Sequence, residues 1–122
     1  MSDMQKVIER YIELWNERDL ASRRSILNDI WVEGGSYTDP QGAADGLPAI
    51  ESMIAAAQQQ FPGFVFRLGD VFDAHHNVVR FTWELLPAGG PESVVVGFDV
   101  AVAAADGRLD KVYGFLDKVP TP

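Results

Sequence analysis

The first half of the chain has the hydrophobic spacing of helices. Apolar residues return every three or four positions between residues 3 and 17, which predicts an amphipathic helix. Asp19 is placed to cap a short second helix, whose apolar positions end near Ile30. Pro48 suits the first turn of a third helix, which the Phe-Pro-Gly sequence at residues 61–63 brings to an end.

The second half of the chain changes to the composition and two-residue period of strands. Four segments have this character: residues 64–72, 78–85, 93–105 and 109–116. Asp106–Gly107 is a hairpin signal between the last two. An earlier strand is predicted over residues 31–39, with a bulge at Gly34 and Gly35. This order indicates the α+β class, with three helices packed into a cone by a strongly curved, mainly antiparallel sheet.

Residues 93–105 form the longest predicted strand and carry a single acid, Asp99. Since strand side chains alternate between faces, the acid shares its face with small residues: Val95, Gly97, Ala101 and Ala103. A lone carboxylate among small residues suggests a cavity above it. The opposite face is apolar and must also be covered: Val94, Val96, Phe98, Val100 and Val102. We therefore expect a homodimer through this outer face of the sheet.

Two further polar side chains could reach such a cavity. Asp39 ends the first strand, and Pro40 holds it in an extended conformation beside a loop, residues 41–46, that can form a pocket rim. Tyr11 lies in the apolar stripe of the first helix, so its hydroxyl needs a buried partner or a wet pocket. Both have structural interpretations as well, since Asp39 could merely end a strand and Tyr11 could be a core tyrosine.

Composition narrows the class of partner. The chain has 122 residues, which favours a single domain over residues 1–122, and its net charge of −8 leaves no basic patch for nucleic acid or an anionic membrane. It has no cysteine, which excludes disulfides, thiol nucleophiles and zinc–thiolate sites. Neither a signal-peptide pattern nor an apolar run of about 20 residues is present. We expect a soluble, cytoplasmic protein.

Four short motifs stand in order along nearly the whole chain: Val7-Ile8-Glu9-Arg10-Tyr11 with residues 16–20, Tyr37-Thr38-Asp39-Pro40 with Gly42 and Gly46, Gly97-Phe98-Asp99, and Asp106-Gly107-Arg108-Leu109. This series resembles the nuclear-transport-factor-2-like, or SnoaL-like, superfamily. That superfamily includes polyketide cyclases, ketosteroid isomerases and limonene epoxide hydrolases. The resemblance implies a single cone-shaped domain.

Within the superfamily, the polar residues are most similar to those of ketosteroid isomerase. This likeness implies that Asp39 is a general base, which moves a proton from a carbon next to a carbonyl to another carbon. It implies that Tyr11 and a neutral Asp99 donate hydrogen bonds to the enolate oxygen, as in that isomerase. The substrate would be a small hydrophobic carbonyl compound, and no metal or organic cofactor is needed. We expect six residues in the pocket walls: Trp15, Tyr37, Met53, Trp83, Tyr113 and Phe115.

A non-catalytic alternative stays open. The isomerases have a further tyrosine on the third helix, where this chain has Met53 and Ile54. This difference favours a dimeric ligand-binding protein of the same fold. In that case Asp99 would be a structural acceptor for Tyr11 or Tyr113.

Two other activities of the superfamily fit the residues less well. SnoaL-type cyclases pair an aspartate with a strand histidine, whereas His75 and His76 fall in a predicted turn. Epoxide hydrolases need an arginine two residues before an aspartate, and Arg80 is instead followed by Thr82.

Overall fold

A six-stranded sheet with the order β2-β1-β6-β5-β4-β3 dominates the computed structural model, which describes residues 2–120. The elements follow the chain as α1 (Ser2–Asn16), α2 (Leu20–Ile30), β1 (Trp31–Asp39), β2 (Gly42–Asp45), α3 (Leu47–Gln60), β3 (Phe64–His75), β4 (Val78–Pro87), β5 (Val95–Ala103) and β6 (Leu109–Lys118). Neighbouring strands are antiparallel, except that β1 and β6 are parallel. The predicted α+β class is confirmed.

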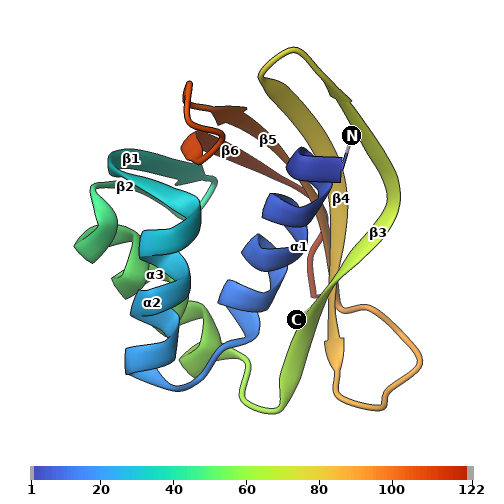
Figure 1. Cartoon of the computed structure of the whole chain (residues 1–122). Helices are drawn as coiled ribbons and strands as arrows, with labels where there is room; N and C mark the ends of the chain where they lie inside the picture. The colour runs from blue at the N-terminus through green and yellow to red at the C-terminus, as the bar shows by residue number, and fades with distance from the viewer. Residues whose placement is uncertain (1, 121–122) are drawn as a thin grey trace.

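The sheet curves around the helices (Figure 1). α1 lies against its inner face, and α2 and α3 lie beside β1 and β2. The curvature has a local cause in β3, where the pairing with β4 shifts register between Leu68 and Phe72. At this bulge the Thr82 hydroxyl accepts a hydrogen bond from the Val71 N–H at 3.1 Å. The helices therefore sit inside a cone-shaped sheet, as predicted.

The inner face of the sheet and the helices enclose one apolar core. The apolar stripe of α1 contributes Ile8 and Leu14, and α3 contributes Ile50, all fully buried. The sheet contributes Trp31 from β1 and Phe81 from β4. Burial of each such side chain stabilises the fold by about 1.5–3 kcal/mol.

Polar contacts fix the C-terminal end of α1. The Asn16 amide donates to Phe66 O at 2.8 Å, and its side-chain carbonyl accepts from Phe66 N at 2.7 Å. From α3, the Gln58 amide donates to the carbonyl oxygens of Trp15 and Glu17 at 3.1 and 2.7 Å. The two bonds from Gln58 satisfy carbonyl groups that the end of α1 leaves free. They also hold Trp15 in place between the helices and the sheet.

Arg23 ties α2 to α3 and to the turn that follows α1. Its side chain is buried, and it donates to Glu51 Oε2 at 2.9 Å and to Gln58 Oε1 at 2.8 Å on α3. It also donates to the carbonyl oxygen of Glu17 at 3.2 Å. A buried guanidinium is tolerated only with such a set of acceptors.

The four strands of the second half each differ from the expected bounds by two or three residues at one end or both, and β5 spans Val95–Ala103. Two differences change the outline of the sheet. Residues 42–45, expected in a loop, form β2 because the chain reverses directly after Asp39 and pairs back onto β1. β3 continues to His75, so the turn before β4 is shorter than predicted. The bulge predicted in β1 is confirmed, since its pairing with β6 shifts register between Trp31 and Ser36.

From the sequence, residues 118–122 are predicted to form a tail beyond the last strand. Lys118 instead ends β6, and its ammonium group donates to Ser93 O at 2.8 Å. Residues 121–122 of the expected tail lie outside the described residues. Among residues 2–120, no helix is long and apolar enough to cross a membrane.

Candidate active site

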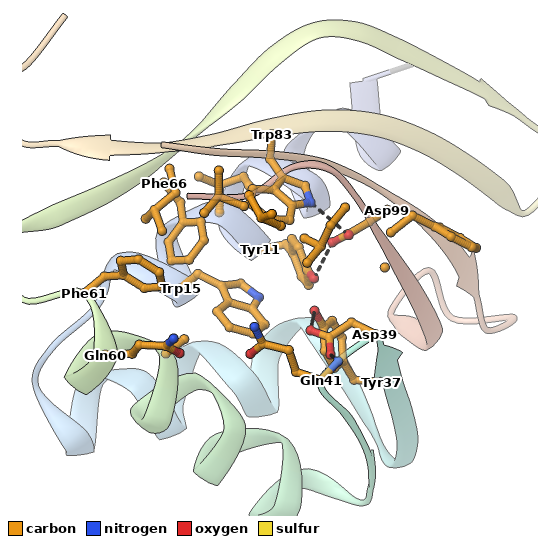
Figure 2. A pocket seen from close by; sticks show the side chains of 18 of the residues that line it. Tyr11, Trp15, Tyr37, Asp39, Gln41, Gln60, Phe61, Phe66, Trp83 and Asp99 are labelled. Atoms are coloured by element: carbon orange, nitrogen blue, oxygen red, sulfur yellow. Dashed lines mark hydrogen bonds between the residues drawn. The ribbon is translucent and has the colours of Figure 1, made fainter. Parts of the chain in front are cut away.

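A cavity of about 350 Å³ lies between α1, α3 and the inner face of the sheet (Figure 2). This volume is at the lower end of the range for small-molecule sites. Its aromatic lining includes two tryptophans and two phenylalanines: Trp15, Phe61, Phe66 and Trp83. Most of its polar lining belongs to two tyrosine–carboxylate pairs. Its exposed lining residues mark the mouth and include Gln41, Gln60, Val119 and Pro120.

The first pair joins α1 to β5. Tyr11 Oη donates to Asp99 Oδ2 at 2.7 Å, and the indole N–H of Trp83 donates to Asp99 Oδ1 at 2.9 Å (Figure 2). Tyr11 and Asp99 are each 2% exposed. A buried carboxylate is costly without partners, and here each of its oxygens has a donor.

The strand register explains why Trp83 reaches this acid. Trp83 on β4 stands opposite Gly97 on β5, two residues before Asp99. A Cβ atom on Gly97 would lie 2.5 Å from Cζ2 of the Trp83 ring. The ring therefore lies across the glycine and brings its nitrogen to the neighbouring carboxyl. Part of the space expected above the small residues of β5 is filled in this way.

The environment of the first pair shifts its proton affinity. Burial raises the pKa of Asp99 from 3.8 to about 6, because desolvation disfavours the charged form. The hydrogen bonds from Tyr11 and Trp83 oppose this rise, and the charge of Asp39 adds to it. Burial, followed by the charge of Asp99, raises the pKa of Tyr11 well above its ordinary value. Near pH 6 Asp99 thus changes between an acceptor and a donor.

The second pair lies at the end of β1. Tyr37 Oη donates to Asp39 Oδ2 at 2.7 Å, and the backbone N–H groups of Gln41 and Gly42 donate to Asp39 Oδ1 at 2.8 and 3.2 Å. Pro40 favours the extended conformation of Asp39, from which the turn into β2 brings these two amides back to the carboxylate. Burial and the charges of both aspartates raise the pKa of Tyr37 above its ordinary range.

Gly114 on β6 lies between the two pairs. It stands opposite Asp99 in the β5–β6 ladder. A Cβ atom on it would lie 3.0 Å from Asp99 Oδ1, 3.2 Å from Asp39 Cβ and 3.3 Å from Tyr37 Oη. One small group placed over this glycine can therefore touch both pairs.

The structure brings six of the predicted site residues to this one cavity: Tyr11, Asp39, Asp99, Trp15, Tyr37 and Trp83. Met53 is not part of the lining, and the prediction for it is wrong. It lies one turn before Ala57 on α3, beside Gly42, and α3 lines the cavity instead with Ala57 and Gln60.

The prediction for Tyr113 is also wrong. In the β5–β6 ladder Val102 pairs with Lys111, whereas the next residue of β5, Ala103, pairs with Leu109. Asp110 is therefore an extra residue in β6. One extra residue reverses the alternation of a strand. Tyr113 therefore lies on the outer face and is 40% exposed.

Phe115 borders both the cavity and the outer face of the sheet. It contributes to the cavity lining, but its ring stacks on Phe98 with centroids 4.8 Å apart. Because its side chain is 47% exposed, we assign the ring to the outer face and only the neighbouring backbone to the cavity.

Several lining residues were not predicted. Phe66, on the inner face of β3, could have been found from the alternation of that strand, since Phe64, Phe66 and Leu68 share a face. Gln60 lies seven residues after Met53, on the same helical face. For Val119 and Pro120, the sequence contains no signal, because their position depends on where β6 ends.

The titratable groups near the β3–β4 turn are separate from the cavity. His75 and His76 are exposed, with their Nδ1 atoms 3.1 Å apart. Arg80 pairs with Asp73 at 3.6 Å, as expected for an exposed sheet face. Within the described part of the chain, no group of three or more histidine, aspartate or glutamate side chains is arranged to hold a metal ion.

Solved structures share this architecture. A nuclear-transport-factor-2-like protein of unknown function from Cytophaga hutchinsonii superposes with a TM-score of 0.69 at 10% identity, covering 93% of this chain and 89% of that chain. A proposed SnoaL-like polyketide cyclase from Jannaschia sp. CCS1 does so with a TM-score of 0.76 at 16% identity, covering 95% and 86%. These likenesses define the fold as the nuclear-transport-factor-2-like cone.

Two comparisons give the family. A proposed isomerase of the SnoaL-like family from Agrobacterium tumefaciens strain C58 is 38% identical, with a TM-score of 0.89 over 96% of this chain and 99% of that chain. Residues 8–112 match the family model of the SnoaL-like domain, and the chain belongs to this family. The resemblance inferred from the motifs is confirmed. No curated protein matches the chain significantly.

Proposed function

We propose that the protein is a small acid–base enzyme of the isomerase or cyclase type, which acts on a hydrophobic carbonyl compound through its own side chains. The observation that carries this proposal is that Tyr11, Asp39 and Asp99 line the same cavity, whose walls are mostly apolar. The likeness to proteins described as a proposed isomerase and a proposed polyketide cyclase supports it.

In the proposed reaction, Asp39 takes a proton from a carbon next to the substrate carbonyl. The electron pair of the broken C–H bond forms the enolate, and the Asp39 carboxyl then returns the proton to another carbon, so that no atom is gained or lost. Tyr37 and two backbone amides orient Asp39, and Oδ2 keeps a lone pair for the incoming proton.

Tyr11 and Asp99 would stabilise the enolate oxygen. Burial raises the pKa of Asp99 to about 6, and a developing oxyanion beside it would favour the neutral, donating form further. One donor aimed at such an oxyanion contributes about 3 kcal/mol to transition-state stabilisation. The space over Gly114, which both pairs border, would hold the reacting atoms.

The test is the exchange of ketone α-protons with solvent deuterium, followed by proton NMR over a panel of small cyclic ketones and enones. The wild type should catalyse exchange, and Asp39→Asn should lose at least about 100-fold of the rate. The matched control is Asp45→Asn, which changes an exposed acid on β2 outside the cavity lining. Full activity in Asp39→Asn would contradict the proposed mechanism.

A second candidate is a ligand-binding protein without chemistry. The pairing of both acids with protein donors favours it, because such pairing also occurs in structural sites. This candidate predicts that the ketones bind in the cavity, but that the wild type exchanges no α-protons in any of them. The exchange measurement therefore separates the two functions.

We also propose a homodimer through the outer face of the sheet. The stacked rings of Phe98 and Phe115 and the half-exposed Tyr113 form an apolar surface there that needs a cover. Light scattering should give a dimer for the wild type and a monomer for Phe115→Glu. The control Leu20→Glu changes a comparably exposed residue on α2 and should stay dimeric. A monomeric wild type at micromolar concentration would contradict the dimer.

A further inference from the structure

Two indole N–H groups face the Tyr11–Asp99 pair from different elements. Trp83, from β4, donates to Asp99 Oδ1 at 2.9 Å. Trp15, one helical turn after Tyr11 on α1, is 8% exposed, and its ring meets the Tyr11 ring edge-on with centroids 6.3 Å apart. In Figure 2 the nitrogen edge of Trp15 faces the side of the cavity where Tyr11 and Asp39 lie.

The Trp15 nitrogen is buried without a hydrogen-bond partner among the described residues. Such a donor is uncommon in a folded protein and calls for a functional or structural reason. Of the neighbours that shift the pKa of Tyr11, Trp15 is the one that lowers it. This means that its N–H favours negative charge on the phenol oxygen. While Tyr11 directs its proton to Asp99, the phenol oxygen carries little such charge.

We propose, on the basis of the proposed function, that Trp83 and Trp15 are positioning residues for the oxyanion site. Trp83 holds the Asp99 carboxyl in place through Oδ1. Trp15 donates to Tyr11 Oη when Tyr11 turns its own hydrogen bond from Asp99 to a ligand oxygen. This donation gives the buried Trp15 N–H the acceptor that it lacks among the described residues.

The two tryptophans then have separable effects. Removing the Trp83 donor withdraws a hydrogen bond that favours the charged Asp99, so its pKa should rise. The other titratable groups that face Asp99 are Tyr11 from α1 and Tyr37 and Asp39 from β1, and this change leaves them in place. Removing the Trp15 donor should leave the Asp99 titration unchanged and weaken only the binding of a ligand oxygen.

The experiment uses Trp83→Phe, Trp15→Phe and the matched control Trp31→Phe. Trp31 is fully buried beside Tyr11, with ring centroids 5.8 Å apart, and its nitrogen also has no partner in the described chain. Its nitrogen lies against Gly35 on β1. Each variant removes one indole N–H and keeps an aromatic ring.

The first readout is the ¹³Cγ signal of Asp99 against pH in the ligand-free protein. We expect a midpoint near pH 6 in the wild type and in the Trp15 and Trp31 variants, and a midpoint about one unit higher in Trp83→Phe. An equal midpoint in Trp83→Phe and Trp31→Phe would overturn the role of Trp83. This readout needs no ligand and does not depend on the proposed reaction.

The second readout is calorimetric binding of 2-naphthol at pH 5, where Asp99 is mostly neutral. We expect Trp15→Phe to bind about threefold to tenfold more weakly than Trp31→Phe. Equal binding would overturn the role of Trp15 while leaving the proposed function intact. A wild type that binds no naphthol would overturn both the role of Trp15 and the proposed function. The Asp99 titration would still decide the role of Trp83.

The indole ¹⁵N–¹H signals of the wild type test the same points without any variant. The Trp83 signal should titrate together with Asp99. The Trp15 signal should move downfield when naphthol binds, whereas the Trp31 signal should stay in place. A Trp83 signal independent of the Asp99 titration, or a Trp15 signal indifferent to naphthol, would contradict the respective role.

Discussion

Tyr11 on the first helix donates a 2.7 Å hydrogen bond to Asp99, which lies 88 residues further along the chain on β5. This bond joins the helix to the sheet at the centre of the cavity. It also stabilises the charged form of an acid that burial otherwise disfavours. The stability of the fold and the protonation of the candidate site are therefore coupled through one side chain.

Asp99→Asn should increase stability more at neutral pH than at pH 4. Because the folded-state pKa of Asp99, about 6, exceeds 3.8, the folded protein binds this proton more tightly than the unfolded chain. The resulting stabilisation is fully present below about pH 3.8 and is lost as the pH rises through 6. The amide cannot ionise, so the variant lacks this loss.

Urea unfolding of the wild type and Asp99→Asn at pH 4 and pH 7.5 measures this effect. The free energy of unfolding of the variant, relative to the wild type, should be higher at pH 7.5 than at pH 4 by roughly 2.5 kcal/mol. The other carboxyl groups are common to both proteins and cancel. A difference that does not change with pH would contradict the raised pKa.

Gly114→Ala should close the space between the two tyrosine–carboxylate pairs. The new methyl group would lie 3.0 Å from Asp99 Oδ1 and 3.3 Å from Tyr37 Oη, where a ligand would otherwise sit. Binding of 2-naphthol should weaken at least about tenfold, whereas the stability should change by about 1 kcal/mol. Gly34→Ala is the control, since a methyl group there meets nothing within 4 Å. Unchanged binding in Gly114→Ala, measured by calorimetry, would place the ligand elsewhere.

Asn16→Ala should loosen the connection between α1 and β3. It removes both hydrogen bonds to the Phe66 backbone and leaves a half-buried N–H and C=O without partners. We expect a loss of about 2 kcal/mol in the free energy of unfolding. The control Asn28→Ala removes an exposed amide that makes one hydrogen bond, to Arg24 O. Its loss of unfolding free energy should stay within about 0.5 kcal/mol. Equal losses in both variants would mean that the Asn16 pairing adds nothing.

Arg23→Met should destabilise the helical side of the protein strongly. It leaves the Glu51 carboxylate, whose side chain is 14% exposed, without its cation at 2.8 Å. Breaking a buried ion pair in this way costs about 3–5 kcal/mol. Arg10→Met is the control, because its pairs with Glu13 and Asp29 are exposed and should contribute at most about 1 kcal/mol. Thermal unfolding of the two variants should therefore differ clearly, and similar melting temperatures would contradict this assignment.

The sequence predicted the parts of the site that depend on local periodicity. The alternation of residues 93–105 placed Asp99 on the inner face of β5, because β4 pairs with this strand without interruption. The helical period placed Tyr11 and Trp15 on the buried face of α1. Pro40 indicated the conformation of Asp39, which depends only on the next residue in the chain.

What the sequence could not predict depends on register between distant strands. The position of Trp83 above Gly97 follows from the pairing of β4 with β5. This position makes the Trp83 N–H the second donor to Asp99. The extra residue Asp110 in β6 reversed the alternation expected for Tyr113. Neither feature has a local signal, because the bulge is visible only when both strands are aligned.

The two acids of the cavity sit on strands that do not pair with each other. Asp39 is on β1 and Asp99 on β5, and β6 runs between them with a glycine at the point of closest approach. The half of the site that would remove the proton and the half that would hold the oxygen can thus be redesigned one at a time. Replacing the β1–β2 corner could install a different base or a nucleophile while the donors on α1 and β4 stay as they are. Variants of the two halves can for this reason be made and compared separately.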